Sequence, residues 1–367
     1  KNFYSFVRHA NSGHTNYDSP DLELYVIAVL QAHAFHAEMC RLYGVLNTAS
    51  SINRYMPQGL VTALGYDYRD MIQHMPDLLW YINQFALKLG TLAVPSSINL
   101  MRRWTFLNSI IFTDNTNMKS QFYLYAQKAF WKFDETTEAS GTSLQPLEFR
   151  STATRTFGQL VTFGNSLLNP LIASEDAGIM SGDILKAYGQ ENIFKISIIA
   201  SDYSVLPVFN AEVLQQLHNT VFAGMTNFEL LPVTQDVDRN IILHDQKLPS
   251  NASSHVGIDA IIDSFLDTPS PDDVLVMTRT TLVGPVSDSS GALVTTLYSG
   301  SEVPVSMTIT YFKYGSSGDA NLTQTTMDGW MSFGDVQATL PQNASAYTAL
   351  THKIQILSVF DYAPRIT

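Results

Sequence analysis

The sequence predicts an α+β fold, with a mainly helical region over residues 1–235 and a β-rich module over residues 236–345. Broad apolar stripes at helical spacing fill the first half, whereas the second half has short β-branched runs between Ser, Thr, Gly, Pro and Asp clusters. The net charge also differs between the first and second halves of the chain. Residues 1–190 hold 14 basic and 15 acidic side chains, and residues 191–367 hold 7 and 18, giving net charges of −1 and −11. The final segment, 346–367, is predicted to be a strand that returns to the main body.

Four helices are predicted in the first 112 residues, at 21–43, 57–65, 69–89 and 96–112. Asp21 is the predicted N-cap of the first helix, and Gly44 is its predicted end. Pro76 is expected to kink or split the third helix because proline lacks an amide donor. Ser96 or Ser97 is expected to cap the fourth helix.

The following segments alternate between the two types of structure. Residues 122–133 are dense in aromatic side chains and alternate in part, which predicts a strand or hairpin, followed by a polar loop over 135–145. Further helices are predicted at 152–168, 182–188 and 212–222, the last capped by Asn210. Further strands are predicted at 194–200, 240–244, 273–281, 292–298, 303–314 and 354–362.

Two of the predicted helices, 69–89 and 96–112, carry apolar residues around much of their circumference. A helix with a single core-facing stripe does not require this distribution. We therefore expect both helices to be almost wholly enclosed, by their own chain on one side and by other elements or subunits on the other. Four large aromatic residues are the expected anchors: Trp80, Phe85, Trp104 and Phe106.

The composition excludes several classes of protein. The chain is 45% hydrophobic, 11% aromatic and only 15% charged, against roughly a quarter charged in an average domain. Much of its surface is therefore neutral, which suits a subunit that buries surface against copies of itself. A net charge of −12 argues against strong nucleic-acid binding by the chain as a whole. Cys40 is the single cysteine, so a disulfide framework and a multi-cysteine metal site are excluded, and a reducing compartment is expected.

No targeting pattern is recognisable in the sequence. The longest apolar runs are far shorter than the roughly 18 residues that a membrane-spanning helix needs, and no signal-peptide pattern is present. Because the chain begins at Lys1, we expect its natural start to lie further upstream. The sequons at Asn251, Asn321 and Asn343 are expected by chance in a Ser/Thr-rich sequence.

One possible metal site lies in the first long helix. His33, His36 and Cys40 fall on one helical face, and two imidazoles with a thiolate suit zinc if Glu38 or His9 supplies a fourth ligand. The alternative is a partly buried face whose histidines are satisfied by hydrogen bonds. We favour this structural interpretation because catalytic zinc motifs have firmer spacing.

Acidic residues offer a second possible chemistry. Asp259, Asp263 and Asp267 follow at helical spacing, with Asp272 and Asp273 beyond them, and such acids can hold Mg²⁺ through phosphates. A solvated acidic face is the favoured interpretation, since nothing nearby predicts an apolar cavity. Four further acids are interpreted as loop residues: Asp134, Glu135, Asp236 and Asp238, the last beside Arg239. Two of them could in principle form the catalytic carboxylate pair of a glycosidase.

Basic residues next to tryptophans give the candidate RNA contacts. Arg102 and Arg103 precede Trp104, and Lys128 and Lys132 flank Trp131. Such groups can grip phosphates while an aromatic ring stacks on a base. The favoured alternative is that they bridge neighbouring helices or subunits, with the tryptophans in the core.

Three stretches together resemble a known family. They are INRYMPQGLVTALGYDYRDMIQ (52–73), PSSINLMRRWTFLNSIIFTD (95–114) and MKSQFYLYAQKAFWKF (118–133). Their order resembles the capsid proteins of small bisegmented double-stranded RNA viruses, over about residues 25–170. The chain length favours the partitivirus (cryptic-virus) type, with the picobirnavirus capsid protein as the close alternative.

The resemblance implies a structural protein of the virion, present in the host cytoplasm, without enzymatic activity, cofactor or membrane association. Region 1–235 would be a helical shell domain, and 236–345 a protruding, arch-forming dimerisation module. Quasi-symmetric homodimers would close an icosahedral T=1 shell around the double-stranded RNA genome and the viral RNA polymerase. Contact with the RNA would be weak and non-specific, made by the four basic residues above or by a missing N-terminal arm. The alternative function is a cytoplasmic metal-dependent hydrolase that uses the acids near 259–273.

Overall fold

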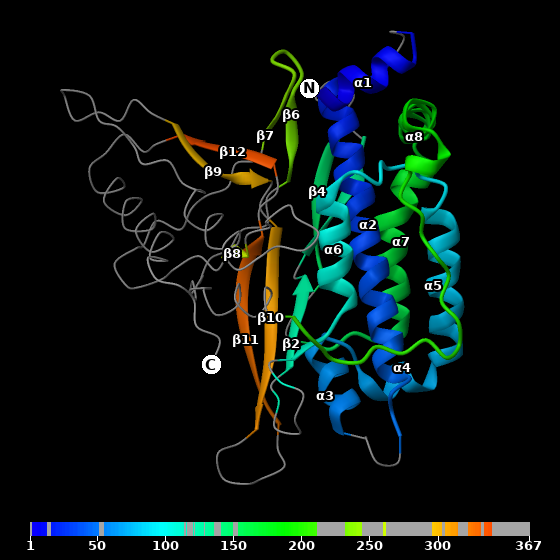
Figure 1. Cartoon of the computed structure of the whole chain (residues 1–367), viewed down its shortest axis with the longest axis vertical. Coiled ribbons are helices and arrows are strands. Elements are labelled where there is room, and N and C mark those ends of the chain that lie inside the picture. The colour runs from blue at the N-terminus through cyan, green and yellow to red at the C-terminus, as the bar shows by residue number, and fades with distance from the viewer. Residues whose placement is uncertain are drawn as a thin grey trace, which may run out of the picture. The chain divides into compact units, whose positions relative to one another are not determined.

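Figure 1 shows the computed structural model of the chain. It describes residues 2–12, 16–50, 55–113, 115, 120, 122–127, 129–135, 141–149, 153–210 and 232–243, with the strand backbone at 260–261, 296–302, 305–314, 322–331 and 334–339. The chain forms two compact units. The helical unit comprises Lys1–Ile110, Lys128–Leu206 and Leu231–His244, and the sheet unit comprises Ile111–Gln127, Pro207–Leu230 and Asp245–Thr367. The predicted α+β class is confirmed.

Helix α2 (Ser19–Leu46) is the centre of the helical unit. All of its residues except Asp21, Glu23 and Ile27 are buried. The N-cap is Asp18, three residues before the predicted cap, and Asp21 occupies the third helical position. The Asp21 carboxylate accepts a 3.1 Å hydrogen bond from the Asp18 amide, which satisfies a donor that the first helical turn leaves unpaired.

Gly44 does not end α2, contrary to the prediction, because the helix continues to Leu46. A Cβ atom at Gly44 would lie 2.5 Å from Val205 Cγ2 and 2.9 Å from the Val205 backbone nitrogen. The glycine therefore permits a close approach of another chain segment and has no role in stopping the helix.

Seven further helices lie among the described residues of this unit: α1 (Asn2–Ala10), α3 (Tyr55–Ala63), α4 (Tyr68–Gln73), α5 (Met75–Leu89), α6 (Asn99–Ser109), α7 (Phe157–Ala173) and α8 (Glu175–Tyr188). Helices α3, α5, α6 and α7 contact α2, which explains why nearly all of its residues are buried. The predicted split near Pro76 is confirmed, since α4 ends before it and α5 begins with it in the first turn. The single-turn helix η2 (Gln190–Asn192) follows α8.

Helix α6 begins later than predicted. Its N-cap is Ile98, so the prediction of Ser96 or Ser97 as the cap is wrong. Pro95 instead pairs with Ile193 in an isolated β-bridge, and the Ser96 hydroxyl donates to the Asn192 carbonyl over 3.0 Å. Contacts with residues 192–193 thus hold the chain before α6, which starts after a turn at residues 96–97.

Two antiparallel strand pairs complete the helical unit. Strand β3 (Ala129–Asp134) pairs with β4 (Ser143–Glu148), and β6 (Thr234–Asp236) pairs with β7 (Ile241–Leu243). The β3 strand packs on α2 and α7. Four rings meet there with centroids 4.5–5.7 Å apart: Phe35, Phe130, Phe149 and Phe163. Edge-to-face and tilted ring contacts of this kind add to the hydrophobic stabilisation of the core.

Residues 193–206, here called the strap, run beside α5 and on to the end of α2 in an extended course (Figure 1). The predicted strand at 194–200 is therefore wrong. The Asn83 side chain donates to the Ile199 carbonyl and accepts from the Ile199 amide, over 3.1 and 2.9 Å. The Tyr43 hydroxyl donates to the Ser201 carbonyl over 2.9 Å. The strap's extended backbone is thus satisfied in part by helix side chains and not by a second strand.

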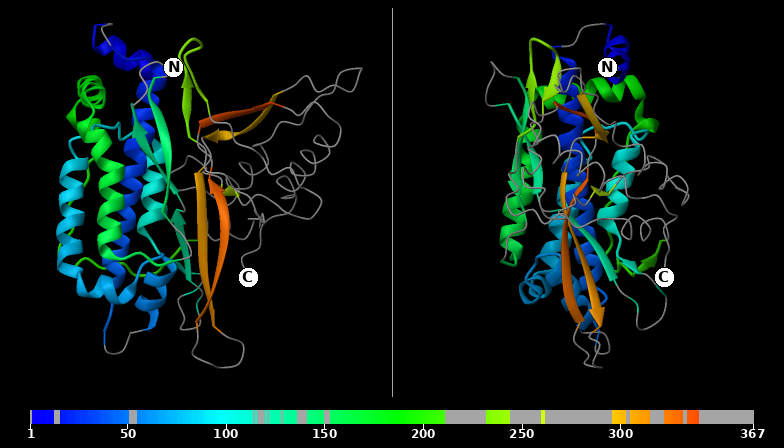
Figure 2. Two further views of the ribbon diagram at one scale, coloured as in Figure 1. Left: turned by 180° about the vertical axis from the view of Figure 1, so that it is seen from behind. Right: turned by 90° about the vertical axis from the view of Figure 1, so that its left-hand side faces the viewer.

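The sheet unit contains a six-stranded sheet in the order β5-β1-β2-β10-β11-β8. Its strands are β1 (Phe112–Thr113), β2 (Phe122–Gln127), β5 (Val208–Phe209), β8 (Ala260–Ile261), β10 (Val305–Tyr314) and β11 (Leu322–Met331). Figure 2 shows β10 and β11 as a long pair, and β9 (Thr296–Glu302) pairs separately with β12 (Gly334–Thr339). Strand β2 pairs with β10 and is thus separated from β3, although the two were predicted as one strand or hairpin.

Several later predictions have mixed outcomes. The predicted helices at 152–168 and 182–188 are confirmed as α7 and α8, both with different limits, and the strands at 240–244, 292–298 and 303–314 correspond to β7, β9 and β10. Strand β11 was not predicted. The helix at 212–222 and the strands at 273–281 and 354–362 lie outside the described residues. The limits of the module at 236–345 and of the returning strand at 346–367 stay predictions.

Candidate interaction surface

The proposed metal ligands of α2 lie in a dry interior. The Cys40 Sγ atom is 3.6 Å from His36 Nε2, and the His33 ring meets the edge of Phe194 at a centroid distance of 5.1 Å. Burial lowers the pKa of His33 to about 3 and that of His36 to about 4, and raises the pKa of Cys40 to about 12. Within the described part of the chain, no three His, Cys, Asp or Glu side chains are arranged to hold a metal ion. His33, His36 and Cys40 are buried and pack in the core.

The other polar residues of α2 bind neighbouring elements. The Tyr66 hydroxyl donates to Glu38 Oε1 over 2.8 Å, so Glu38 serves the packing of the segment after α3 and is no metal ligand. Arg41, fully buried, donates through Nη1 to the Leu107 and Ile110 carbonyls, over 3.3 and 3.2 Å. Those carbonyls lie at the carboxyl end of α6, where a positive charge is favourable. His9 is exposed on α1, away from these groups in the sequence and on another helix.

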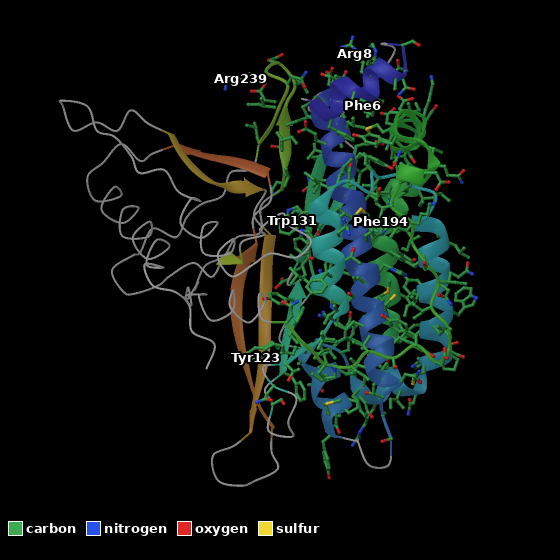
Figure 3. The ribbon with its side chains drawn as sticks, in the orientation of Figure 1. Phe6, Arg8, Tyr123, Trp131, Phe194 and Arg239 are labelled. Atoms are coloured by element: carbon green, nitrogen blue, oxygen red, sulfur yellow. The ribbon has the colours of Figure 1, made fainter. Side chains whose placement is uncertain are left out.

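The loop acids in the described residues have local structural roles. The Ser174 hydroxyl donates to Glu135 Oε1, and Ser174 is also the N-cap of α8. Asp236 accepts from the Arg239 amide over 3.0 Å within the β6–β7 turn, and Figure 3 shows Arg239 at the tip of that hairpin. The hydrolase candidates Asp259, Asp263, Asp267, Asp272 and Asp273 lie outside the described residues.

Two of the four candidate RNA contacts have described side chains, on different elements. Arg102 is exposed on α6, whereas Lys132 is half-buried on β3, opposite Gln145 of β4. The Arg103 side chain and the whole of Lys128 lie outside the described residues. Trp104 and Trp131, which precede or follow these residues, are both buried in the core, and Figure 3 labels Trp131 on β3. Neither tryptophan can stack on a nucleic-acid base without unfolding its surroundings.

The predicted aromatic anchors do not share one environment. Phe85 and Trp104 are buried as predicted, and Phe106 is partly exposed. Trp80 is 65% exposed in the single chain, so it lies on the side of α5 that its own chain leaves open. The reason is geometric: five residues separate Trp80 from Phe85, which turns their side chains about 140° apart on the helix.

Large apolar side chains are exposed at many places on the helical unit: Phe6, Tyr55, Ile72, Trp80, Leu87, Ile172, Ile179, Leu185, Ile198 and Leu206. Single exposed apolar residues are normal on a soluble protein. Trp80 and Leu87 differ because they lie seven residues apart on one face of α5, and Ile198 lies on the strap beside them. We call Trp80, Gln84, Leu87 and Ile198 the α5 strip. The sequence did not identify this strip, because apolar residues around residues 69–89 predicted enclosure without indicating which side the chain's own elements cover.

No helix within the described ranges has the length and hydropathy that crossing a lipid bilayer requires.

Comparison with known proteins connects this fold to a family. The family model described as "Picobirnavirus, Capsid protein" matches residues 1–243. A "Capsid protein precursor" from Human picobirnavirus (strain Human/Thailand/Hy005102/-) is 29% identical over 235 residues, which are 64% of this chain and 42% of that protein. The matched region thus spans about two fifths of that relative's length.

A solved structure shares the fold. The chain described as "X-ray crystallographic structure of the picobirnavirus capsid" aligns with a TM-score of 0.66 and 22% identity, over 96% of this chain and 73% of that one. At this identity the likeness shows the fold alone. Of the two virus types that the sequence suggested, these comparisons support the picobirnavirus alternative, and the preference for the partitivirus type is corrected.

Proposed function

This chain belongs to the picobirnavirus capsid protein family, and we propose from this that it is a structural protein that assembles with copies of itself into a closed viral shell. The match of the family model to residues 1–243 carries the proposal, because this range contains nearly all of the described helical unit. The charge-poor composition and the exposed apolar side chains of that unit support it, since both are typical of a protein that buries surface between subunits.

The finer features of the proposal are quasi-symmetric homodimers and an icosahedral T=1 shell that encloses double-stranded RNA and the viral RNA polymerase. The β-rich module at 236–345 would project outward and join two chains. Its support is the uneven charge, because residues 191–367 carry a net charge of −11 and would repel RNA on an inner face. Residues 1–190, with a net charge of −1, would tolerate the genome better.

Binding of the genome would be weak and independent of sequence. Arg102 and Lys132 are the described members of the candidate set, and both would act by phosphate charge. Removing one phosphate contact lowers the salt slope of binding by about 1. Arg102→Ala should therefore change the salt dependence of RNA binding slightly and equally for unrelated sequences.

We propose no enzymatic function. The hydrolase alternative has no supporting observation, because its acids lie outside the described residues, and Glu135 and Asp236 accept local hydrogen bonds from Ser174 and Arg239.

Sedimentation of the purified chain, followed by negative-stain microscopy, tests the proposed function. We expect closed particles of megadalton size. A species no larger than a small oligomer at every protein and salt concentration tried would contradict the proposal. Deletion of residues 245–345 in the same assay spares the β6–β7 hairpin of the helical unit. It should leave the helical part folded and reduce the yield of particles, whereas normal assembly would show that the module has no part in it.

A further inference from the structure

A neutral apolar strip lies along one face of α5. Trp80, Gln84 and Leu87 fall within about 60° of one another at about 100° per residue, and Trp80 and Leu87 are 65% and 60% exposed. The helix carries no acidic or basic side chain between Asp77 and Lys88. An exposed tryptophan and leucine on one charge-free helix face are costly in water unless another surface covers them.

The strap widens this strip. Asn83 and Ile199 share two hydrogen bonds, and a Cβ atom at Gly90 would lie 3.2 Å from Ile196 Cγ2. The strap therefore runs antiparallel to α5, with three strap residues covering the length of seven helical residues, about 10 Å in both cases. Ile198 lies in this stretch and is 63% exposed. The Ile198 side chain therefore adds exposed apolar surface beside the helix.

Two opposite charges mark the ends of the strip. Asp77 is near the beginning of α5 and Lys88 is in its last turn. Both lie on the same flank, about 60° and 80° round from Trp80, whereas Asn83 and the strap lie on the other flank. Among the residues that the structure describes, neither side chain forms an ion pair. The surface is therefore apolar in the middle, acidic at one end and basic at the other.

We propose that the α5 strip is a contact between two copies of this chain, related by a two-fold axis with their α5 helices antiparallel. The proposal rests on the proposed function and names a surface for it. A two-fold contact brings the same patch of both subunits together, so the patch must be complementary to itself. With the centre at Asn83 and Gln84, Trp80 of each copy lies opposite Leu87 of the other.

The same register pairs the charges. Asp77 of one copy then lies within two residues, about 3 Å along the axis, of Lys88 of the other. Because the two-fold axis relates like flanks, both Asp77–Lys88 pairs form on one side of the contact and both straps meet on the other. A parallel arrangement would instead place the Asp77 residues of the two copies at the same height, far along the axis from either Lys88. The absence of basic groups between the ends disfavours RNA as the occupant.

Charge reversal tests the contact directly. Asp77→Lys and Lys88→Asp each create like-charge pairs on both sides of the two-fold axis, and the double variant restores opposite charges. We expect each single variant to raise the protein concentration needed for particle formation by roughly tenfold, and the double variant to recover most of this loss. Circular dichroism and the thermal midpoint of each variant check that the fold is intact. Folded single variants that assemble as readily as the unaltered chain would overturn the proposal, as would a double variant no better than the singles.

Cross-linking gives an independent measurement. Gln84→Cys places a thiol at the centre of the contact, while Cys40 is buried and unreactive. Gly158→Cys on α7 is the matched control, because a Cβ atom there meets nothing within 4 Å and its residue is exposed. A short bis-maleimide should join Gln84→Cys chains in pairs and leave the control as single chains.

The outcomes separate the two proposals. Particles of Gln84→Cys that yield no cross-linked pairs would overturn the α5 contact and leave the proposed function standing. If the unaltered chain forms no particles, the proposed function fails, and the same cross-linking on the concentrated soluble chain still decides whether α5 pairs with itself.

Discussion

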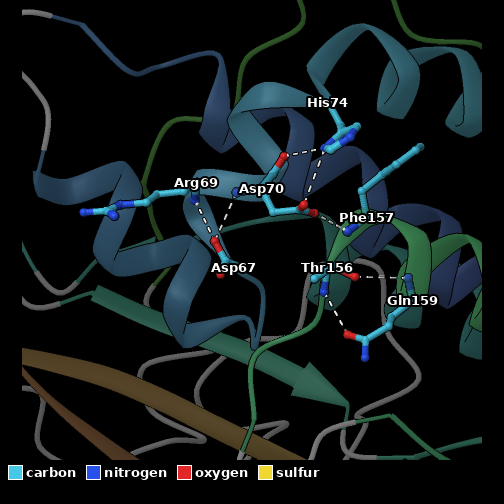
Figure 4. A network of polar contacts seen from close by, with 7 residues as sticks. All are labelled: Asp67, Arg69, Asp70, His74, Thr156, Phe157 and Gln159. Atoms are coloured by element: carbon cyan, nitrogen blue, oxygen red, sulfur yellow. Dashed lines mark hydrogen bonds and ion pairs between the residues drawn. The ribbon is translucent and has the colours of Figure 1, made fainter.

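The carboxylate of Asp70 accepts a 2.6 Å hydrogen bond from the backbone amide of Phe157, 87 residues further along the chain. Figure 4 shows this contact between α4 and the first residue of α7. The His74 ring stacks on Phe157 at 5.3 Å, with its Nδ1 3.6 Å from Asp70 Oδ1. Thr156 and Gln159 cap α7 reciprocally, so Asp70 satisfies a further amide at the same helix end.

Replacing Asp70 by alanine should destabilise the helical unit. The variant removes an acceptor and a negative charge from the amino end of α7, which typically costs about 1–2 kcal/mol. Urea unfolding of the unassembled chain, monitored by circular dichroism, measures the change. Asp70→Asn keeps an acceptor, so it should lose less. Equal losses in the two variants would show that a neutral acceptor contributes nothing here and that the effect comes from the carboxylate charge.

Gly44→Ala should displace the strap from α2. The added methyl group would lie 2.5 Å from Val205 Cγ2 and 2.9 Å from its backbone nitrogen, so the strap must move. Overpacking of this kind typically costs about 1–3 kcal/mol. The measurement is the unfolding free energy together with the rate of proteolysis within the strap, which should rise.

Gly158→Ala is the control for that variant. Gly158 is exposed in the first turn of α7, where a methyl group meets nothing within 4 Å. The substitution should stabilise the protein by about 0.4–1 kcal/mol through the unfolded state. Destabilisation by both variants to the same extent would refute the steric explanation for Gly44.

The unassembled chain should lose stability as the pH falls below about 6.5. Burial lowers the folded-state pKa of His33 to about 3 and of His36 to about 4, so the unfolded chain binds more protons between these values and 6.5. Stability is therefore complete above 6.5 and declines toward acid. At pH 5 each histidine accounts for a loss of roughly 2 kcal/mol.

The comparison with His33→Gln isolates this effect from the carboxylates, which also titrate in acid. The variant should be less stable at pH 7.5 because it changes a packed ring, yet its stability should fall less steeply between pH 6.5 and pH 5. Parallel pH profiles for the two proteins would mean that His33 is already protonated in the folded state or that it is not buried in solution.

Trp104→Ala and Trp80→Ala should have opposite consequences. Trp104 is buried in α6, and truncation of a buried aromatic residue costs roughly 3–5 kcal/mol, a large part of a domain's total stability. Trp80 is largely exposed, so its loss should leave the fold intact and impair assembly alone. Circular dichroism and sedimentation on the same samples distinguish the two. A well-folded Trp104→Ala chain that fails only in assembly would show that this residue acts at an interface.

Local signals in the sequence predicted much of the helical unit. Pro76 divides α4 from α5 because its missing donor interrupts the helix, and Gly65 follows α3 with a positive φ of 82°. These effects act within a few residues. They could therefore be inferred without knowledge of the neighbouring chain.

The wrong predictions concern residues whose conformation or burial depends on a segment that is distant in the sequence. The apolar run at 194–200 has strand-like residues, but its hydrogen-bond partner is the Asn83 side chain of a helix. Gly44 is explained by Val205. The exposure of Trp80 could not be predicted because burial depends on which helices surround α5, and periodicity alone does not identify the side that faces away from them.

Because nearly all of α2 is buried, the helix depends on chain segments that are synthesised long after it. Tyr43 and Gly44 near the end of α2 are covered by Ser201 and Val205, which the ribosome adds about 160 residues later. At a translation rate of roughly 5–20 residues per second, the end of this apolar helix stays uncovered for roughly 8–30 s until Ser201 and Val205 are synthesised. During that interval it presents the kind of surface that chaperones bind, so we expect nascent chains that stop before residue 200 to aggregate or to be held by chaperones.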